Sequence, residues 1–153
     1  MNTKYLFASV MMLAVSAFAN DCAFELRSTD IMTFIDMQGN SVPSITVPNS
    51  CEDFTISHVG KMPRTTMGHN NVVISKTGDI KEIIKDGLRY GSIVTDYIKP
   101  DDKRVIAKSG VIGKGEATSV RFSVAQIKDD DYSFFCSFAG HDRKMRDKLI
   151  VAE

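Results

Sequence analysis

The stretch from Cys136 to Met145 constrains this chain more than any other part of the sequence. It reads Cys-Ser-Phe-Ala-Gly-His-Asp-Arg-Lys-Met, so a thiol, an imidazole and a thioether follow one another with the spacing C-x4-H-x3-M. A thiolate and an imidazole suit copper or zinc, and the thioether shifts the preference toward copper, because soft sulfur ligands suit Cu(I). The set lacks one strong ligand, and the chain has only two other histidines, His58 and His69, to supply it.

The neighbouring residues predict that this stretch is a loop between two strands. Alternate residues of 132–138 share one face, which puts Cys136 in an apolar, aromatic row. Ala139 and Gly140 allow a turn, and residues 149–151 close the chain as a second strand. Such a loop holds its side chains rigidly, as a metal site of fixed geometry requires. A single cysteine or methionine here is more often a core residue, so the spacing carries the metal prediction.

Residues 1–19 have the pattern of a signal peptide. Lys4 supplies a positive start, residues 5–17 are mostly apolar, and Ala17-Phe18-Ala19 forms an A-x-A cleavage site. We therefore expect an exported protein whose mature chain begins at Asn20. The apolar run is too short to span a membrane comfortably, and no other candidate span follows it.

Residues 20–153 are expected to form a single domain. This part has 134 residues (153 minus 19), which is enough for one core, and no repeat or linker interrupts it. Without Lys4 it has 18 basic and 19 acidic residues, a formal charge of −1. No strong field favours nucleic acid or an anionic membrane surface as a partner. We expect a monomer.

All three cysteines lie in the expected mature chain. We expect a disulfide between Cys22 and Cys51, which on the chain-entropy model stabilises the fold by roughly 3–4 kcal/mol. Cys136 is then an odd thiol in an exported protein, which indicates a metal site or thiol chemistry. Two alternatives stay open at this stage: Cys136 pairs with one of the other two, or a disulfide joins two molecules.

The remaining pattern is that of an all-β protein with one helix. Short alternating runs separated by turn residues predict an antiparallel sandwich or barrel. These runs lie around residues 24–26, 45–47, 54–56, 72–74, 105–106, 120–124, 132–138 and 149–151. Residues 79–90 instead predict one short helical insertion, with Asp79 near its start as the capping residue. Its apolar stripe, expected to contact the core, consists of Ile80, Ile83, Ile84 and Leu88.

The two histidines outside the C-terminal stretch differ in their surroundings. His58 is in phase with the apolar residues of 54–56, so we expect a core histidine with a hydrogen-bond partner. His69 follows Gly68, which exposes backbone, and stands just before the apolar run at 72–74. His69 is therefore the better ligand candidate and completes a set of two histidines, one cysteine and one methionine.

These residues resemble the azurins, a family of blue-copper proteins or cupredoxins, over essentially the whole of residues 20–153. The spacing C-x4-H-x3-M is the most specific part of the resemblance. The other matching segments are Cys22, Ser50-Cys51, Ser57-His58, Gly60, Met67-Gly68-His69-Asn70, residues 96–102 and 104–107, Ile112-Gly113, Gly115-Glu116 and residues 132–145.

The resemblance implies a cupredoxin-like Greek-key β-sandwich that binds one copper ion and transfers single electrons in the periplasm. In the family's pattern His69, Cys136 and His141 are the equatorial ligands. Met145 is a weak axial ligand, and the carbonyl of Gly68 approaches from the opposite side. Two histidines and a cysteine with a long axial methionine are the ligands of blue-copper electron-transfer sites.

The resemblance also implies the disulfide and the surroundings of the metal. Asn70 and Ser137 match a pair that ties the two ligand-bearing segments together. Transient redox partners, such as c-type cytochromes or periplasmic reductases and oxidases, are expected to dock around an exposed edge of His141, through which electrons pass. The expected docking residues are Met32, Met62, Met67, Phe138, Ala139 and Gly140. No catalytic residue and no enzymatic activity are implied.

The sequence departs from the family's usual pattern in four places. The interval between the first two cysteines is long, and residues 37–41 are expected to form an extra hairpin. Ala139 stands in place of a proline, and Asn71 stands in place of an aromatic residue. Residues 142–144 put charges between two ligands. These departures bear on the partner surface more than on the metal site.

Two other functions stay open at this stage. A periplasmic copper carrier or storage protein uses the same ligands to hold metal and pass it on, and readily exchanging metal favours it. An enzyme uses Cys136 as a nucleophile with His141 or His69 as base. Activity that survives metal chelation, with Cys136 labelled by a thiol reagent in the native protein, favours that reading.

Overall fold

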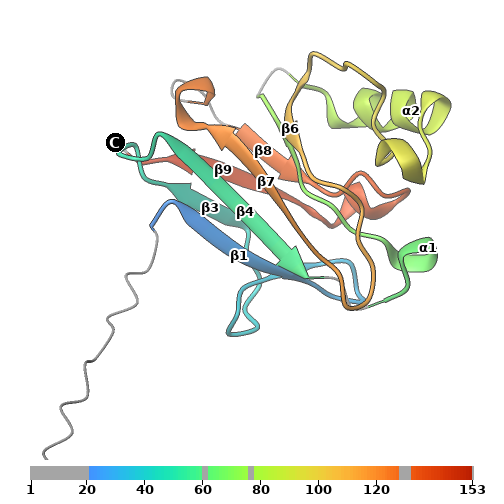
Figure 1. The fold of residues 1–153 in the computed structure, drawn as a ribbon, viewed down its shortest axis with the longest axis horizontal. Coiled ribbons are helices and arrows are strands. Elements are labelled where there is room, and N and C mark those ends of the chain that lie inside the picture. The colour runs from blue at the N-terminus through green and yellow to red at the C-terminus, as the bar shows by residue number, and fades with distance from the viewer. Residues whose placement is uncertain (1–20, 60–61, 76–77, 128–131, 153) are drawn as a thin grey trace, which may run out of the picture.

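The computed structural model describes residues 21–59, 62–75, 78–127 and 132–152, without the side chains of residues 57 and 58. The expected signal peptide and its cleavage site lie outside the described residues. Two β-sheets stack face to face, and helices α1 (Arg64–Met67) and α2 (Ile80–Tyr90) lie toward one end of the stack (Figure 1). None of the helices in this described part has the length and apolar character that crossing a membrane requires.

The strands form one sheet of four and one sheet of five, which confirms the expected all-β sandwich. The first sheet has the order β2-β1-β4-β7, formed by β1 (Ala23–Ser28), β2 (Phe34–Ile35), β4 (Asp53–Val59) and β7 (Ala117–Ser123). The second has the order β3-β9-β8-β5-β6, formed by β3 (Ser44–Val47), β5 (Val72–Ile74), β6 (Val105–Lys108), β8 (Tyr132–Phe135) and β9 (Arg146–Val151).

Two of the strand pairs are parallel, so the expectation of a purely antiparallel sandwich was wrong. β1 runs parallel to β4, with Leu26 opposite His58, and β3 runs parallel to β9, with Ile45 opposite Leu149. In both cases strands of the other sheet intervene in the sequence. Local alternation identifies which face of a strand is buried, but long-range packing decides which strand lies beside it.

The core fills the space between the sheets. Leu26 and Ile56 of the first sheet and Phe134 and Leu149 of the second are fully buried in one cluster. Each lies on the apolar face that the period-two pattern indicates. The core therefore gives the loops at the end of the sandwich a rigid support.

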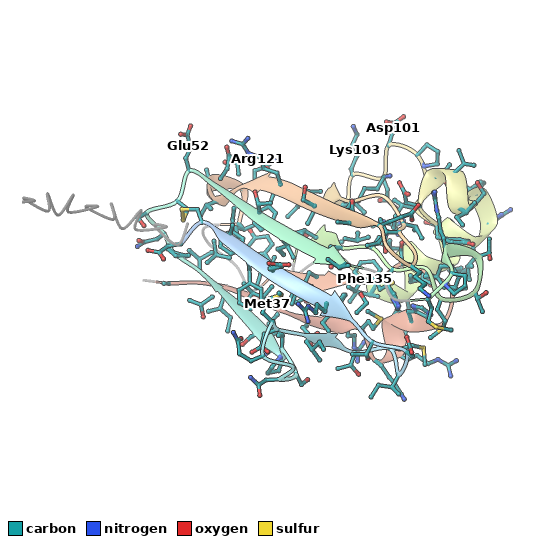
Figure 2. The ribbon with its side chains drawn as sticks, turned by 60° about the horizontal axis from the view of Figure 1, so that its bottom comes forward. Met37, Glu52, Asp101, Lys103, Arg121 and Phe135 are labelled. Atoms are coloured by element: carbon teal, nitrogen blue, oxygen red, sulfur yellow. A yellow bond between two sulfur atoms is a disulfide. The ribbon has the colours of Figure 1, made fainter. Side chains whose placement is uncertain are left out.

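The disulfide joins Cys22 and Cys51, with a sulfur–sulfur distance of 1.99 Å. It connects the start of β1 to the residues just before β4, and its yellow bond is visible near Glu52 (Figure 2). The expected pairing is confirmed. Cys136 is left as a free, buried thiol, so it pairs with neither of the other two cysteines.

Helix α2 (Ile80–Tyr90) confirms the expected insertion, with Asp79 as its N-cap accepting hydrogen bonds from the backbone of the first turn. Ile83 and Ile84 are buried, as expected of the apolar stripe, whereas Leu88 is 53% exposed. The reason lies at Gly87, because a Cβ there would sit 1.9 Å from a backbone oxygen of the neighbouring loop. The face of the helix that carries Gly87 packs against this loop, and Leu88, the next residue, is left exposed to solvent.

The connections contain short elements that the sequence did not predict. Helix α1 (Arg64–Met67) follows β4, and one-turn 3-10 helices cover residues 93–95, 124–126 and 141–143. The expected hairpin at 37–41 is present as a turn that Asp36 caps through the backbone of Gln38 and Asn40. The turn brings Ile35 opposite Ser41.

Candidate metal centre

Three side chains from two loops converge at one end of the sandwich. His69 precedes β5, Cys136 follows the last residue of β8, and His141 begins the turn that leads to β9. Their potential ligand atoms all lie within 4.8 Å of one another. The structure therefore brings together the two histidines and the cysteine that the sequence singled out.

The three donors are closed off from solvent. Cys136 is fully buried, His69 is 1% exposed and His141 is 2% exposed. Burial raises the pKa of the Cys136 thiol to about 12, although the backbone N–H groups of Asn70 and Phe138 partly oppose this. Burial also lowers the pKa of His141, so its imidazole stays neutral and available as a ligand at neutral pH. A thiol in these surroundings loses its proton only when a cation takes the proton's place.

Backbone hydrogen bonds hold the ligand-bearing segments. The N–H and C=O of His69 both bond to Ile112, at 3.0 and 2.8 Å, which anchors the first segment to the neighbouring loop. The N–H of Cys136 donates to the carbonyl of Met145, and the N–H of Met145 donates to the carbonyl of His141, both at 2.9 Å. The C-terminal loop is thus closed by its own backbone, which fixes the positions from which its side chains project.

Gly68 lies against the site and has no room for a side chain. Its carbonyl oxygen is 3.9 Å from the sulfur of Cys136. A Cβ at Gly68 would lie 2.5 Å from a methyl group of Val111 and 2.6 Å from the carbonyl oxygen of Arg64. Close packing, rather than an unusual backbone angle, therefore explains the glycine, and it keeps the carbonyl beside the sulfur.

Met145 is fully buried in the same core cluster as Cys136. Burial is consistent with both roles considered for it, as a packing residue and as a thioether ligand. The hydrogen bonds from its backbone to both other ligand-bearing residues of the loop place it in the same closed unit.

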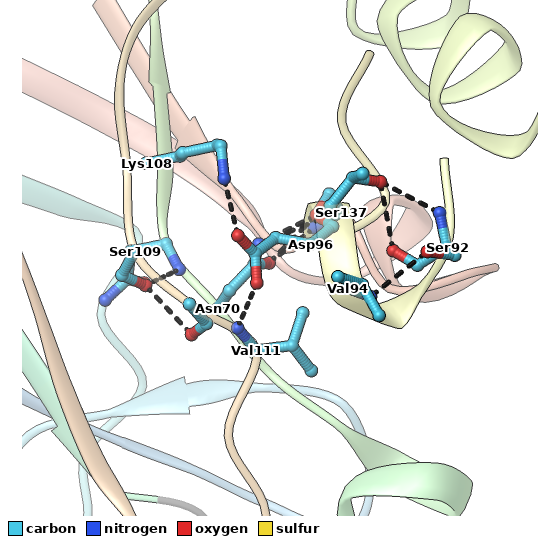
Figure 3. Close-up of polar contacts among 11 residues, drawn as sticks. Asn70, Ser92, Val94, Asp96, Lys108, Ser109, Val111 and Ser137 are labelled. Carbon is cyan, nitrogen blue, oxygen red and sulfur yellow. Dashed lines mark hydrogen bonds and ion pairs between the residues drawn. The ribbon is translucent and has the colours of Figure 1, made fainter. Parts of the chain in front are cut away.

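A hydrogen-bonded cluster joins the two ligand-bearing segments from outside (Figure 3). The N–H of Ser137 donates to the side-chain oxygen of Asn70 at 2.9 Å, and the Asn70 amide donates to the Ser137 hydroxyl at 2.8 Å. This geometry agrees with the pair expected from sequence. The cluster also ties His69 and Cys136 together, because each is the chain neighbour of one member.

Sequence reasoning missed the third member of this cluster, Asp96. Its carbonyl accepts the Ser137 hydroxyl at 2.6 Å, and its carboxylate accepts the N–H of Val111 at 2.9 Å and pairs with Lys108. Asp96 adopts a left-handed backbone with φ 59°, which turns its carbonyl toward Ser137. Aspartate tolerates this conformation better than most residues, but the sequence carries no other sign of the contact.

The expected docking residues differ in their exposure to solvent. Met32, Met62 and Met67 are half-buried, and Ala139 and Gly140 are exposed. The three methionines therefore expose only part of their surface to solvent.

Phe138 is 9% exposed and packs against the ring of His141, with centroids 4.8 Å apart, and against Tyr97. The imidazole of His141 is therefore covered, which differs from the expected exposed edge. The side chain of His58 lies outside the described residues, so its role as a core histidine stays a prediction.

The donor set fits copper. Two imidazoles and one thiol, buried together and backed by a methionine in the same core, are the soft and borderline ligands that copper prefers in a redox site. A β-sandwich with this cluster at its end has the features of a mononuclear copper protein.

Comparison with known proteins agrees with this class. Residues 21–152 match the model of the copper-binding proteins of the plastocyanin/azurin family. The chain is 39% identical to an azurin of Pseudomonas aeruginosa over 143 residues, covering 92% of this chain and 91% of the relative. It is 42% identical to azurin iso-2 of Methylomonas sp. strain J, covering 86% and 98%.

A solved structure supports the same conclusion. The azurin Az-iso2 of Methylomonas sp. strain J aligns with a TM-score of 0.75 and 41% identity, over 86% of this chain and 98% of that one. The chain therefore belongs to the plastocyanin/azurin family of copper-binding proteins. Copper is its cofactor, with His69, Cys136 and His141 positioned as the copper site. Electron transfer is the general role of such blue copper proteins.

Proposed function

We propose that residues 20–153, after removal of residues 1–19, form a monomeric periplasmic protein that shuttles single electrons between redox partners such as c-type cytochromes, reductases or oxidases. Bound copper supplies the one-electron couple between Cu(I) and Cu(II). The A-x-A pattern of the first nineteen residues and the odd buried thiol support the exported, metal-binding assignment.

In this proposal His69, Cys136 and His141 hold the metal as the strong ligands. Met145 would contribute a weak thioether, and the backbone carbonyl of Gly68 would be a further weak ligand. The observation that carries the proposal is the convergence of three buried donors within 4.8 Å in loops closed by backbone hydrogen bonds. A site held in this way changes little between the two oxidation states, so little reorganisation accompanies electron transfer.

The same observations argue against a thiol enzyme. A nucleophilic cysteine needs access to substrate and a lowered pKa. Cys136 is fully buried, and burial raises the pKa of its thiol to about 12. His141 lies 3.6 Å from its sulfur, but nothing opens that pair to a substrate.

Repeated redox cycling in the presence of a Cu(I) chelator distinguishes a shuttle from a carrier. The copper-loaded protein is reduced with ascorbate, re-oxidised, and its retained copper is measured after each cycle. An electron shuttle keeps its copper through many cycles, because the donors are closed off from the chelator. Loss of most of the copper in the first reduced state would favour the carrier and overturn the proposed function.

Docking is proposed at the end of the sandwich that carries the ligand loop. The residues involved are Met32, Met62, Met67, Phe138, Ala139 and Gly140. Phe138 supports this assignment because it is the aromatic residue in ring contact with His141. Exposed Ala139 and Gly140 stand next to it in the sequence and bring the chain surface close to the imidazole.

A further inference from the structure

A groove separates helix α2 from the ligand loop, and it shares one residue, Gly140, with the proposed docking residues. Its volume is about 780 Å³. Figure 1 shows α2 next to the red segment between β8 and β9 that forms the other wall. The lining residues are Lys81, Ile84, Lys85, Leu88 and Arg89 from the helix, and Gly140, Asp142, Arg143 and Arg146 from the loop and β9.

The lining is strongly basic in a chain that is neutral as a whole. Five of these side chains are basic and one, Asp142, is acidic, whereas the full sequence has 19 basic and 19 acidic residues. Among the ion pairs of the described residues, only Lys85 of the five has a carboxylate partner, Glu82 at 3.1 Å on the exposed helix surface. The positive charge of the groove is therefore largely uncompensated.

The groove also has apolar lining residues. Ile84 is 8% exposed, and Leu88, at 53%, is one of the few large hydrophobic side chains in the described residues that face solvent. An apolar centre with a charged rim is the usual composition of a protein interface. Leu88 is exposed because Gly87 packs tightly against the neighbouring loop. Its side chain therefore offers an apolar contact to a partner within a positively charged surface.

We propose that this groove is a docking site for the acidic face of a protein redox partner. The proposal rests on the proposed electron-transfer function and names the charge of the partner. Its connection to the copper site is direct, because Gly140 and Asp142, which line the groove, are the chain neighbours of His141. A partner seated there contacts the ligand loop itself, which brings its redox centre close to the metal.

The arrangement of the charges favours a protein over other anions. All five cations are exposed, whereas a site for a small anion buries most of its ligand among a few fixed polar groups. The apolar contacts lie within a concave groove, which a flat lipid surface does not fill. Exposed charges of one sign raise the rate of encounter with an oppositely charged partner, and this effect weakens as salt is added.

The test measures electron exchange between the reduced copper protein and an oxidised c-type cytochrome of acidic isoelectric point, by stopped flow over a range of ionic strength. The groove variant is Lys81→Glu/Arg89→Glu, which changes the helix wall and leaves the ligand loop intact. The control is Lys103→Glu/Arg121→Glu, with the same change in net charge at residues that do not line the groove (Figure 2). Both variants must keep the visible spectrum of the wild type.

We expect the wild-type rate constant to fall as salt rises. At low salt the groove variant should lose at least about tenfold in rate and most of its salt dependence, while the control loses less than about twofold. Equal rates for the two variants would overturn the docking site. Binding of the wild type to phosphatidylglycerol vesicles that the groove variant loses would also overturn it, by reassigning the groove to a membrane surface.

Reduction by a small neutral hydroquinone separates this proposal from the proposed function. That reaction needs electron transfer but no charged docking site. If the wild-type protein cannot be reduced in this way, electron transfer itself fails, and the docking role fails with it. If reduction proceeds normally and the groove variant still matches the control, only the docking site is wrong.

Discussion

Asn70 and Asn71 are adjacent in the sequence and both fully buried. Their side-chain amides differ in whether they form hydrogen bonds. The Asn70 side chain both donates to and accepts from Ser137, across the two ligand-bearing segments. The Asn71 side chain has no hydrogen-bond partner for either its nitrogen or its oxygen in the described part of the chain. Its backbone bonds to Ser109, so only the amide group is affected.

The difference shows what buried polar groups do in this molecule. A satisfied amide at Asn70 fixes the ligand segments, because its bonds have definite directions in a low-dielectric interior. An amide without partners at Asn71 costs free energy and specifies nothing. Asn71 is also the position where the sequence departs from the aromatic residue typical of the azurins. The metal end is thus held by polar contacts of Asn70, whereas the amide of the next residue makes none in the described part of the chain.

The largest effect is expected from Asn70→Ala. The substitution leaves the N–H of Ser137 buried without its acceptor, so we expect a loss of about 3 kcal/mol in the free energy of unfolding. Urea denaturation of the metal-free protein measures it, with Asn49→Ala on the exposed surface as the control, expected within about 0.5 kcal/mol of wild type. A loss no larger than that of the control would show that the cluster does not hold the segments together.

The opposite sign is expected from Asn71→Leu. Leucine has the same branching and the same number of heavy atoms and removes the unpaired amide, so we expect a gain of about 2 kcal/mol in the free energy of unfolding. Thermal unfolding of the metal-free protein measures it, and Asn71→Ala, which leaves a cavity, should not reproduce the gain. Destabilisation by leucine would show that the amide has a partner, such as a buried water.

Ser28 has a buried polar group, a hydroxyl, that is smaller than the amide of asparagine. Its hydroxyl is fully buried at the end of β1 and has no hydrogen-bond partner among the described residues. We expect Ser28→Ala to raise the free energy of unfolding by about 1 kcal/mol, because a hydroxyl is smaller than an amide. Ser50→Ala, at an exposed position, is the matched control in the same urea titration. A loss of stability at Ser28 would contradict the idea that unpaired groups carry the cost.

Asp147 is a half-buried charged residue, and screening by water reduces its effect on the free energy of unfolding. Burial raises the pKa of its carboxyl to about 6 from 3.8. Between these values the folded state binds more protons than the unfolded state, so stability falls as pH rises from about 4 to 6. Asp147→Asn removes this dependence. Thermal unfolding should favour the variant most above pH 6 and show no difference below about pH 4; a constant difference would contradict the cause.

The fold was predictable where local pattern decides it. Alternating residues identified most of the strands, and the change of period at 79–90 identified the one long helix together with its cap at Asp79. Pattern did not reveal the two-residue strand β2 or the parallel pairs. It also did not show that Gly87 turns Leu88 outward, because that depends on backbone contacts with a loop distant in the sequence.

Two members of the site, Cys136 and His141, were predictable from their spacing in one short stretch of the sequence. His69 was found through its context before β5. The contribution of Asp96 was not, because a backbone carbonyl is common to all residues and only the folded chain directs it to Ser137. The burial of the His141 ring was not predicted for a similar reason, because it arises from the packing of Phe138 against that ring.

The central claim is that Cys136 joins two histidines in one copper site. Titration of residues 20–153 with Cu(II), followed by visible absorption, tests it directly. We expect an intense blue colour that saturates at one copper per chain, bleaches with a reductant and is absent in Cys136→Ala. A colourless protein, or a colour that persists without the thiol, would contradict it.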